Sequence, residues 1–204
     1  MGPKVDNLEY PKTYHLKDGT VVDLRLMTKD DFQALHDFFA ALPEEDRMFL
    51  KEDVTEPSVI QTWIRRLDYD SVIPILAFVG SKLVGDATLH MQSHGWMRHV
   101  GEIRIVVAPE YQKKGIGTVL ARELFYNAVR RGLGKIEAVA MEDQIGAIKS
   151  LERLGFKQEG LLKDYVLDMK GRKHNLIILT HNTDELWKRM EDMIIDSDLF
   201  LEHH

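Results

Sequence analysis

The chain has 204 residues, of which 44% are hydrophobic and 29% charged, a composition typical of an ordinary globular protein. Its 27 basic and 33 acidic side chains give a formal charge of −6, which disfavours general binding to nucleic acid or to anionic membranes. The absence of Cys excludes disulfides, thiolate metal sites and a cysteine nucleophile, and it agrees with a reducing, cytoplasmic setting. No apolar run reaches the roughly 20 residues that a membrane-spanning helix needs, and the first residues lack the apolar stretch of a signal peptide.

The chain is expected to fold as one domain over residues 1–200, because no linker, repeat or low-complexity segment divides it. The closing Leu201-Glu202-His203-His204 has the character of an expression-tag remnant. The first part predicts a β-hairpin, with strands at 13–16 and 21–26 around an Asp-Gly turn. Three helices should follow: one capped by Thr28 that ends near Leu42, a short one from Pro43, and one opened by residues 56–58.

The remaining elements alternate between strands and amphipathic helices. Strands are predicted at 73–79, 83–91 and 100–107 as a meander, then at 135–141, and as a final pair at 165–169 and 175–180. Helices are predicted from residues 115–117 to residues 131–132, at 145–154, and from 184 to about 195. The last helix has an apolar stripe that would pack on the sheet or on a second subunit, formed by Leu186, Met190, Met193 and Ile194.

Residues 106–118 join an apolar strand to the first turn of a long helix, a junction suited to an anion. The free N–H groups of that turn and the helix dipole attract negative charge, and Gly115 and Gly117 let a phosphate approach the backbone. Lys113 and Lys114 add positive charge beside them. A P-loop is excluded because these lysines precede the glycine, and a dinucleotide fingerprint is excluded because Leu120 occupies its third glycine position.

The same loop resembles the signature of a known family. Residues 112–117, Gln-Lys-Lys-Gly-Ile-Gly, fit the Gln/Arg-x-x-Gly-x-Gly/Ala motif of the GNAT superfamily of acyl-CoA-dependent N-acetyltransferases. Residues 107–111 fit the Val-x-Pro-x-Tyr that precedes this motif. Further on, residues 147–156 resemble the family's Ala-x-x-x-Tyr-x-x-Leu-Gly-Phe, and the resemblance extends from around Val21 to Leu179.

The resemblance implies a fold of the α/β (α+β) class. It has a mixed, mostly antiparallel sheet flanked by helices, in which two central strands splay apart into a V-shaped cleft for acetyl-CoA. The backbone of residues 105–107 would then pair with the pantetheine arm, and the amides of residues 112–118 would hold the pyrophosphate. Gln144 replaces a common family Asn and retains an amide donor. The implied cofactor-binding residues are Ile105, Val106, Val107, Gln112, Lys113, Lys114, Gly115, Ile116, Gly117, Thr118 and Gln144.

Transfer of an acetyl group to a primary amine needs the amine neutral, and hence a base or a water relay to one. Glu102 is the expected base, since it lies on the strand before the loop, where several family members carry a functional Glu. An ion pair of Glu102 with a neighbouring cation is the alternative. The family's usual proton donor, a Tyr, is replaced by Leu151, which leaves Tyr126, Tyr165 or solvent to protonate the thiolate. This replacement keeps open a second function, a non-catalytic acyl-CoA-binding regulatory module.

Residues 28–57 carry nine acidic against three basic side chains, a net charge of −6. In the resembled fold this segment borders the acceptor pocket, where a negative field would attract a cationic small molecule or a lysine or N-terminal amine. Acidic residues at helix starts are also favourable in themselves. His90, His94 and His99 gather near one hairpin without metal-ligand spacing, so no metal site is expected.

Overall fold

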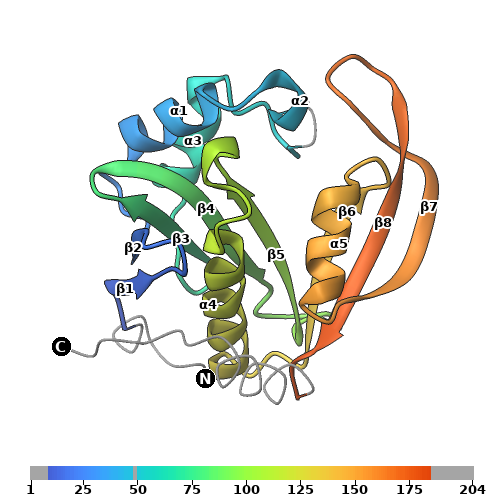
Figure 1. Ribbon diagram of the computed structural model, residues 1–204. Helices are drawn as coiled ribbons and strands as arrows, with labels where there is room; N and C mark the ends of the chain where they lie inside the picture. Colours follow the sequence, from blue (N-terminus) through green and yellow to red (C-terminus); the bar gives the residue numbers. More distant parts are fainter. Residues whose placement is uncertain (1–8, 48–49, 185–204) are drawn as a thin grey trace.

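The computed structural model describes residues 9–47 and 50–184, which are built around one sheet (Figure 1). The strand order in this sheet is β1-β2-β3-β4-β5-β6-β8-β7. Neighbouring strands are antiparallel except β5 and β6, which run parallel. The strands are β1 Lys12–His15, β2 Val21–Leu26, β3 Val72–Val79, β4 Lys82–Met91, β5 Val100–Val107, β6 Lys135–Met141, β7 Lys157–Leu167 and β8 Lys173–Asn182.

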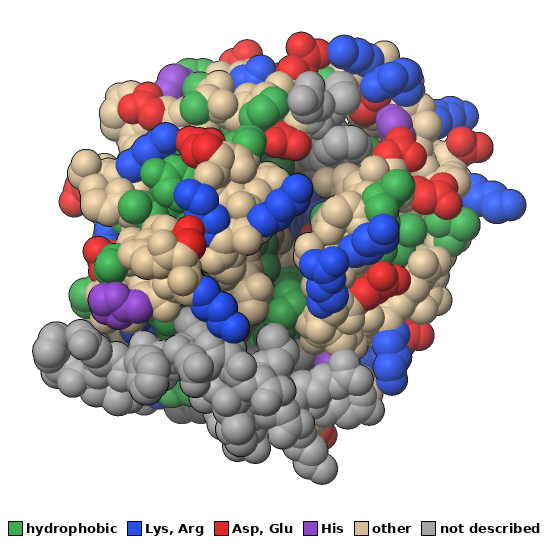
Figure 2. All heavy atoms as spheres, viewed as in Figure 1, with side chains coloured by type: hydrophobic (Ala, Val, Ile, Leu, Met, Phe, Trp, Pro, Cys, Tyr) green, Lys and Arg blue, Asp and Glu red, His purple; other side chains and the backbone are tan. Residues whose placement is uncertain are grey.

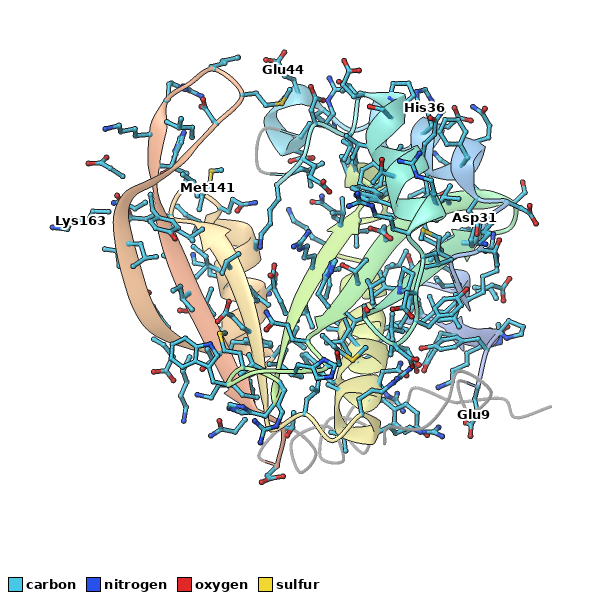
Figure 3. All side chains as sticks on the ribbon, turned by 180° about the vertical axis from the view of Figure 1, so that it is seen from behind. Glu9, Asp31, His36, Glu44, Met141 and Lys163 are labelled. Carbon is cyan, nitrogen blue, oxygen red and sulfur yellow. The ribbon has the colours of Figure 1, made fainter. Side chains whose placement is uncertain are left out.

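Helices cover both faces of this sheet. α4 and α5 lie on one face, whereas α1 and α3 lie on the other, as the two opposite views show (Figures 1 and 3). The helices are α1 Phe32–Ala40, α2 Glu44–Arg47, α3 Pro57–Arg65, the 3-10 helix η2 Pro109–Tyr111, α4 Ile116–Arg130 and α5 Ile145–Arg153. With helices on both of its faces, the sheet is the middle of three layers. Across residues 9–47 and 50–184, no helix has both the length and the apolar character needed to cross a membrane.

Each face of the sheet has its own apolar core. On the α4 face, Leu120 and Leu124 of the helix are fully buried against side chains from the central strands. On the opposite face, Phe39 of α1 and Ile60 of α3 are buried together with Leu76 of β3. Side chains alternate between the two faces along each strand, and β3, β4 and β5 contribute to both cores. This double burial holds the central strands in fixed register.

A buried carboxylate joins the N-terminal strand to α4. The Glu123 side chain is 3% exposed. It accepts hydrogen bonds from Tyr10 Oη (2.8 Å), from Lys12 Nζ (2.9 Å) and from Tyr14 Oη, while Asn127 Nδ2 donates to Tyr10 Oη at 3.0 Å. Burial and the Glu123 charge raise the pKa of both tyrosines, so both keep their protons and act as donors. The network therefore fixes the position of α4.

The predicted fold class is confirmed, and strands 21–26, 100–107 and 135–141 have the predicted bounds. The prediction of a strand at 165–169 was wrong, because β7 begins at Lys157 and ends at Leu167. Most of β7 is exposed and it lies at the edge of the sheet. An exposed edge strand does not need the apolar alternation on which the prediction depended. Its partner β8 is also longer than the predicted 175–180.

Two differences concern helix ends. The sequence predicts Thr28 as the cap of the first helix, but α1 starts directly after Asp31. The Asp31 carboxylate accepts a hydrogen bond from the Thr28 amide (2.7 Å) and pairs with Arg25 (2.5 Å), so these residues stabilise the turn before the helix. The final predicted helix, 184–195, lies outside the described residues apart from Asp184.

Candidate active site

The parallel strands β5 and β6 pair only at their beginnings. Val100–Glu102 of β5 lies in register with Lys135–Glu137 of β6, and the two strands diverge beyond that point (Figure 1). β5 remains paired with β4 as far as Val107, and β6 remains paired with β8 as far as Met141. The two facing edges beyond the paired residues therefore present backbone N–H and C=O groups without a strand partner in the described structure. An extended ligand can pair with such an edge as a further strand would.

The molecular surface is hollowed between the half that contains α4 and the half that contains α5 (Figure 2). Lys and Arg side chains lie on both sides of this hollow. Positive charge at the rim of a groove attracts anionic groups such as phosphates. The shape and charge of this face therefore suit a long anionic ligand.

The loop between β5 and α4 presents free amides at the start of a 15-residue helix. Gly115 precedes the helix with φ 103°, and Lys113 has φ 61°. The amides of residues 113–118 donate to no carbonyl or side chain within the part of the chain that the structure describes. Such amides, together with the positive end of the helix dipole, form an anion site. The geometry therefore supports the predicted phosphate-binding loop.

The two glycines of this loop, Gly115 and Gly117, are needed for different physical reasons. Gly115 has a positive φ, a backbone conformation that residues with a side chain rarely adopt. Gly117 has no such constraint, and a Cβ placed there would lie 3.8 Å from Val107 Cγ2, an ordinary contact. Packing within the described chain therefore does not require a glycine at 117. A ligand that approaches the backbone would require one, which is why the residues present fit a bound pyrophosphate.

The side chains of the loop have distinct surroundings. Gln112 Nε2 donates to the Val107 carbonyl at 3.1 Å, so this side chain holds the loop against the end of β5. Lys114 Nζ lies 5.0 Å from the centre of the Tyr111 ring. Ile116 is 1% exposed, so only its backbone amide can reach a ligand. The loop is thus a backbone site flanked by exposed cations.

Gln144 lies at the opposite side of the diverging strands, where β6 ends and α5 begins. It is the residue directly before α5, and its Oε1 accepts a hydrogen bond from the amide of Met141, the last residue of β6 (2.9 Å). This bond fixes the orientation of the side-chain amide and leaves the Nε2 group as a donor. The structure thus places Gln144 across the divergence from the loop at Gly115.

Glu102 is the last residue of β5 that pairs with β6. Its carboxylate accepts hydrogen bonds from Arg104 Nε (2.9 Å) and from Lys51 Nζ. Burial opposes ionisation, but the bonds from Arg104 and Lys51 outweigh it and lower the pKa of Glu102. The ion pair that the sequence left as the alternative is therefore present. A role for Glu102 as the base stays a prediction.

A polar stripe crosses β4 and β5 on the face that α1 and α3 cover. Asp86, Thr88 and His90 of β4 lie in register with Val106, Arg104 and Glu102 of β5. His90 Nε2 lies 3.0 Å from Thr88 Oγ1, and burial together with the Arg104 charge lowers the pKa of His90 to about 4. His90 is therefore neutral near pH 7, and the stripe combines neutral, cationic and anionic groups in one place.

Asp86 is a residue that the sequence reasoning missed. Burial raises the pKa of its carboxyl to about 7, against the opposing effect of Arg104. The available signal was a single acid inside the apolar strand segment Leu-Val-Gly-Asp-Ala-Thr-Leu at 83–89. Carboxyls with such perturbed pKa values concentrate at functional sites.

The structure places Leu151 and the two tyrosines considered as substitute proton donors, Tyr126 and Tyr165, in different parts of the fold. Leu151, at the family's Tyr position, packs against the α4-side core as an apolar side chain. Tyr126 accepts a hydrogen bond from Arg130 (3.0 Å), and its ring lies 4.8 Å from Lys12 Nζ of β1, so it faces the far edge of the sheet. Tyr165 is 64% exposed on β7. Neither tyrosine lies beside the diverging part of β5.

Some of the acidic residues of segment 28–57 have side-chain partners in the structure. Glu44 pairs with Lys170 of the β7–β8 turn (2.9 Å), and Glu52 accepts a hydrogen bond from Trp63 Nε1 (2.7 Å). Lys51 of the same segment contacts Glu102. Within the described ranges, no group of three or more His, Asp or Glu side chains is arranged to hold a metal ion. Lys170 thus compensates the charge of Glu44, whereas Lys51 compensates Glu102 and not an acid of its own segment.

Comparison with known proteins places these features in a family. The model of the acetyltransferase (GNAT) family matches residues 32–156. N-alpha-acetyltransferase 30 of Xenopus laevis is 31% identical over 123 residues, which cover 58% of this chain and 44% of that protein. The chain thus spans less than half the length of that relative. An uncharacterized N-acetyltransferase of Methanocaldococcus jannaschii is 29% identical over 162 residues, covering 78% of this chain and 67% of that protein.

Solved structures share the same fold. RimJ of Mycobacterium smegmatis, determined in complex with CoA-disulfide, superposes with a TM-score of 0.74 at 18% identity, covering 98% of this chain and 99% of that one. At that identity the likeness concerns the fold alone. The family model, however, matches more than half of the chain, and it includes β5, the loop and α4. The chain therefore belongs to the acetyltransferase (GNAT) family.

Proposed function

We propose that this chain is an N-acetyltransferase that moves an acetyl group from acetyl-CoA to a primary amine. The observation that carries the proposal is the free edge of β5, which leads directly into the free amides before α4. One part suits an extended amide-containing arm and the other a pyrophosphate, and acetyl-CoA contains both in that order. Family membership and the CoA-disulfide in the RimJ structure support the same ligand.

The proposed ligand contacts follow from this placement. The β5 backbone of Ile105, Val106 and Val107 would pair with the pantetheine arm, and the amides of residues 112–118 would bind the pyrophosphate. Lys113 and Lys114 are exposed and would add charge, and Gln144 would donate from across the divergence. Acetyl-CoA supplies the activated thioester carbonyl. The residues of the chain would hold acetyl-CoA in position and supply positive charge to its phosphates.

Glu102 is the proposed catalytic residue on β5. Arg104 and Lys51 lower its pKa, so it is ionised near pH 7 and able to attract an ammonium group or to orient a water. Ionisation also means that its basicity is reduced, because the same cations oppose proton uptake. A water relay from the amine to Glu102 is the form of base catalysis that best suits these contacts.

The proposed acceptor is a cationic small molecule or a lysine or N-terminal amine. The net charge of −6 over residues 28–57 supports a positively charged acceptor. The name of N-alpha-acetyltransferase 30 supports an amino terminus as one member of this class. We further propose a cytoplasmic location, since the reaction consumes acetyl-CoA. A metal ion has no part in the proposed reaction.

The second candidate function is a non-catalytic acyl-CoA-binding module. The observation that favours it is Leu151, an apolar side chain at the position where the resembled family often carries a proton donor. Solvent can replace such a donor, because a thiolate is a good leaving group and water reaches an open cleft. We therefore retain catalysis as the conclusion.

One experiment separates the two functions. Thermal melting is measured with and without acetyl-CoA, and thiol release is then followed on the same samples with spermidine, lysine amide, an alanine-terminated peptide and a neutral-side-chain amino acid. Acetyl-CoA at about 100 times its Kd should stabilise the native state by about 2.7 kcal/mol. Thiol release with one amine class would confirm the transferase and identify its acceptor. A melting shift without turnover would favour the binding module, and no shift would contradict the loop assignment.

A further inference from the structure

Asp86 lies in the middle of β4, in register with Leu76 on β3 and Val106 on β5. Directly opposed residues of neighbouring strands point to the same face of a sheet. Leu76 is fully buried, and Val106 packs against the same apolar core. The Asp86 carboxyl is thus placed between two apolar side chains on the face that α1 and α3 cover.

Asp86 is half-buried, and its carboxyl accepts no hydrogen bond from another described residue, unlike Glu123 and Glu102. Glu123 accepts bonds from three side chains, and Glu102 accepts bonds from two. The charge that acts on Asp86 is that of Arg104, whose Nε is already bonded to Glu102. The half-buried carboxyl thus lacks a donor that would hold it ionised. An ammonium group bound beside it would supply that donor.

Asp86 also lies beside the proposed acetyl-CoA site. Val106, its neighbour across the sheet, belongs to the β5 segment whose edge has no strand partner. Glu102 lies four residues before Val106 on β5, which is about 13 Å along the strand at roughly 3.3 Å per residue. Asp86 is therefore the carboxyl beside the free segment of β5, whereas Glu102 lies where β5 and β6 are still paired.

We propose that Asp86 is a catalytic residue that contacts the acceptor amine and takes up its proton, which deepens and rests on the proposed function. The acceptor arrives as an ammonium ion and gives one proton to the Asp86 carboxylate. The nitrogen lone pair attacks the thioester carbonyl, so an N–C bond forms and the C–S bond breaks. The second amine proton ends on the CoA sulfur as a thiol, and the Asp86 proton passes to solvent.

The charged surroundings suit this role. The other titratable or charged groups on this face come from four strands and from the segment before α3. They are Asp23 and Arg25 on β2, with Asp31 paired to Arg25, His90 on β4, Glu102 and Arg104 on β5, Glu137 on β6, and Lys51 and Glu52 before α3. The α1 and α3 side chains in the adjoining core are apolar. Burial raises the pKa of Asp86 to about 7, so it is part-ionised at neutral pH and a stronger base than an ordinary carboxylate. Glu102, whose pKa is lowered, is the weaker base of the two, so in this scheme it attracts the ammonium group while Asp86 takes up the proton.

The test compares Asp86→Asn with Asp23→Asn, a matched change on β2 where the carboxylate accepts from Thr13 Oγ1 at 2.6 Å. Both variants should keep the melting shift that acetyl-CoA causes. Asp86→Asn should lower kcat/KM for the best amine by about 100-fold to 10,000-fold, while Asp23→Asn should match the wild type. An Asp86→Asn variant that binds acetyl-CoA and retains kcat/KM within about threefold of wild type overturns the proposal.

The pH dependence gives a second readout that a structural role would not produce. Wild-type kcat/KM should level off above about pH 7.5, whereas Asp86→Asn should gain about tenfold per pH unit up to about pH 9, as the neutral fraction of an amine of pKa near 10 increases. If Asp86→Asn does not fold, a wild-type profile that keeps rising through this range overturns the proposal. Failure of the wild type to acetylate any amine overturns the proposed function itself, a separate result.

Discussion

Replacement of Glu123 by Gln should strongly destabilise the fold. The Glu123 side chain is 3% exposed and that of its partner Lys12 is 20% exposed. Removing one partner of a buried ion pair costs about 3–5 kcal/mol, and the partial exposure of Lys12 favours the lower end. Gln keeps one oxygen as an acceptor for a tyrosine but loses the charge that strengthens each bond. We therefore expect a loss of about 3 kcal/mol in the free energy of unfolding.

Urea unfolding measures this loss. With a slope of about 2 kcal/mol per molar urea, the midpoint should fall by about 1.5 M. The matched control is Glu110→Gln, which removes a pair with Lys82 in which both side chains are more than half exposed, 53% for Glu110 and 59% for Lys82. That change should cost about 1 kcal/mol or less. The reasoning is refuted if Glu123→Gln costs no more than the exposed control.

At the β7–β8 hairpin, hydrogen bonds to Asp168 and Asp143 raise the pKa of His174. Protonated His174 therefore stabilises the fold fully below the unfolded pKa of about 6.5, and this stabilisation is lost as pH rises through the higher folded pKa. His174→Asn should therefore lower the melting temperature more at about pH 5.5 than at about pH 9, and equal losses would contradict this. Glu102→Gln should lower turnover in the thiol-release assay by about 100-fold, and near-normal turnover would remove Glu102 from the catalytic assignment. Gly101→Ala would place a Cβ 2.6 and 2.8 Å from two buried leucine methyl groups, so denaturant unfolding should show a loss of about 1–3 kcal/mol, whereas unchanged stability would contradict the packing.

The loop before α4 could be predicted from sequence because its chemistry is local. Proline ends β5, glycine with a positive φ precedes the helix, and the free amides follow from the helix start itself. The same residues carry the family resemblance. Neither inference needed knowledge of a distant contact, which is why the structure supports both.

Properties that depend on distant contacts could not be predicted. Lys51 contacts Glu102 across 51 residues of sequence, so the ion pair was only one of two alternatives for that strand. Asp86 becomes unusual only after β3 and β5 are placed on either side of it. The start of β7 was missed because an exposed edge strand is selected by its partner β8 and not by its own apolar pattern.

The most direct test of the central claim is the Kd of acetyl-CoA for the wild type, Gly115→Asn and Gly115→Asp, measured by titration calorimetry. Asn and Asp have nearly the same size and experience the same strain at φ 103°, so they differ mainly in the charge placed before α4. The account predicts that the Asp variant binds about 100-fold more weakly than the Asn variant, a difference of about 2.7 kcal/mol. Equal affinities of the two variants would contradict a pyrophosphate site at this loop.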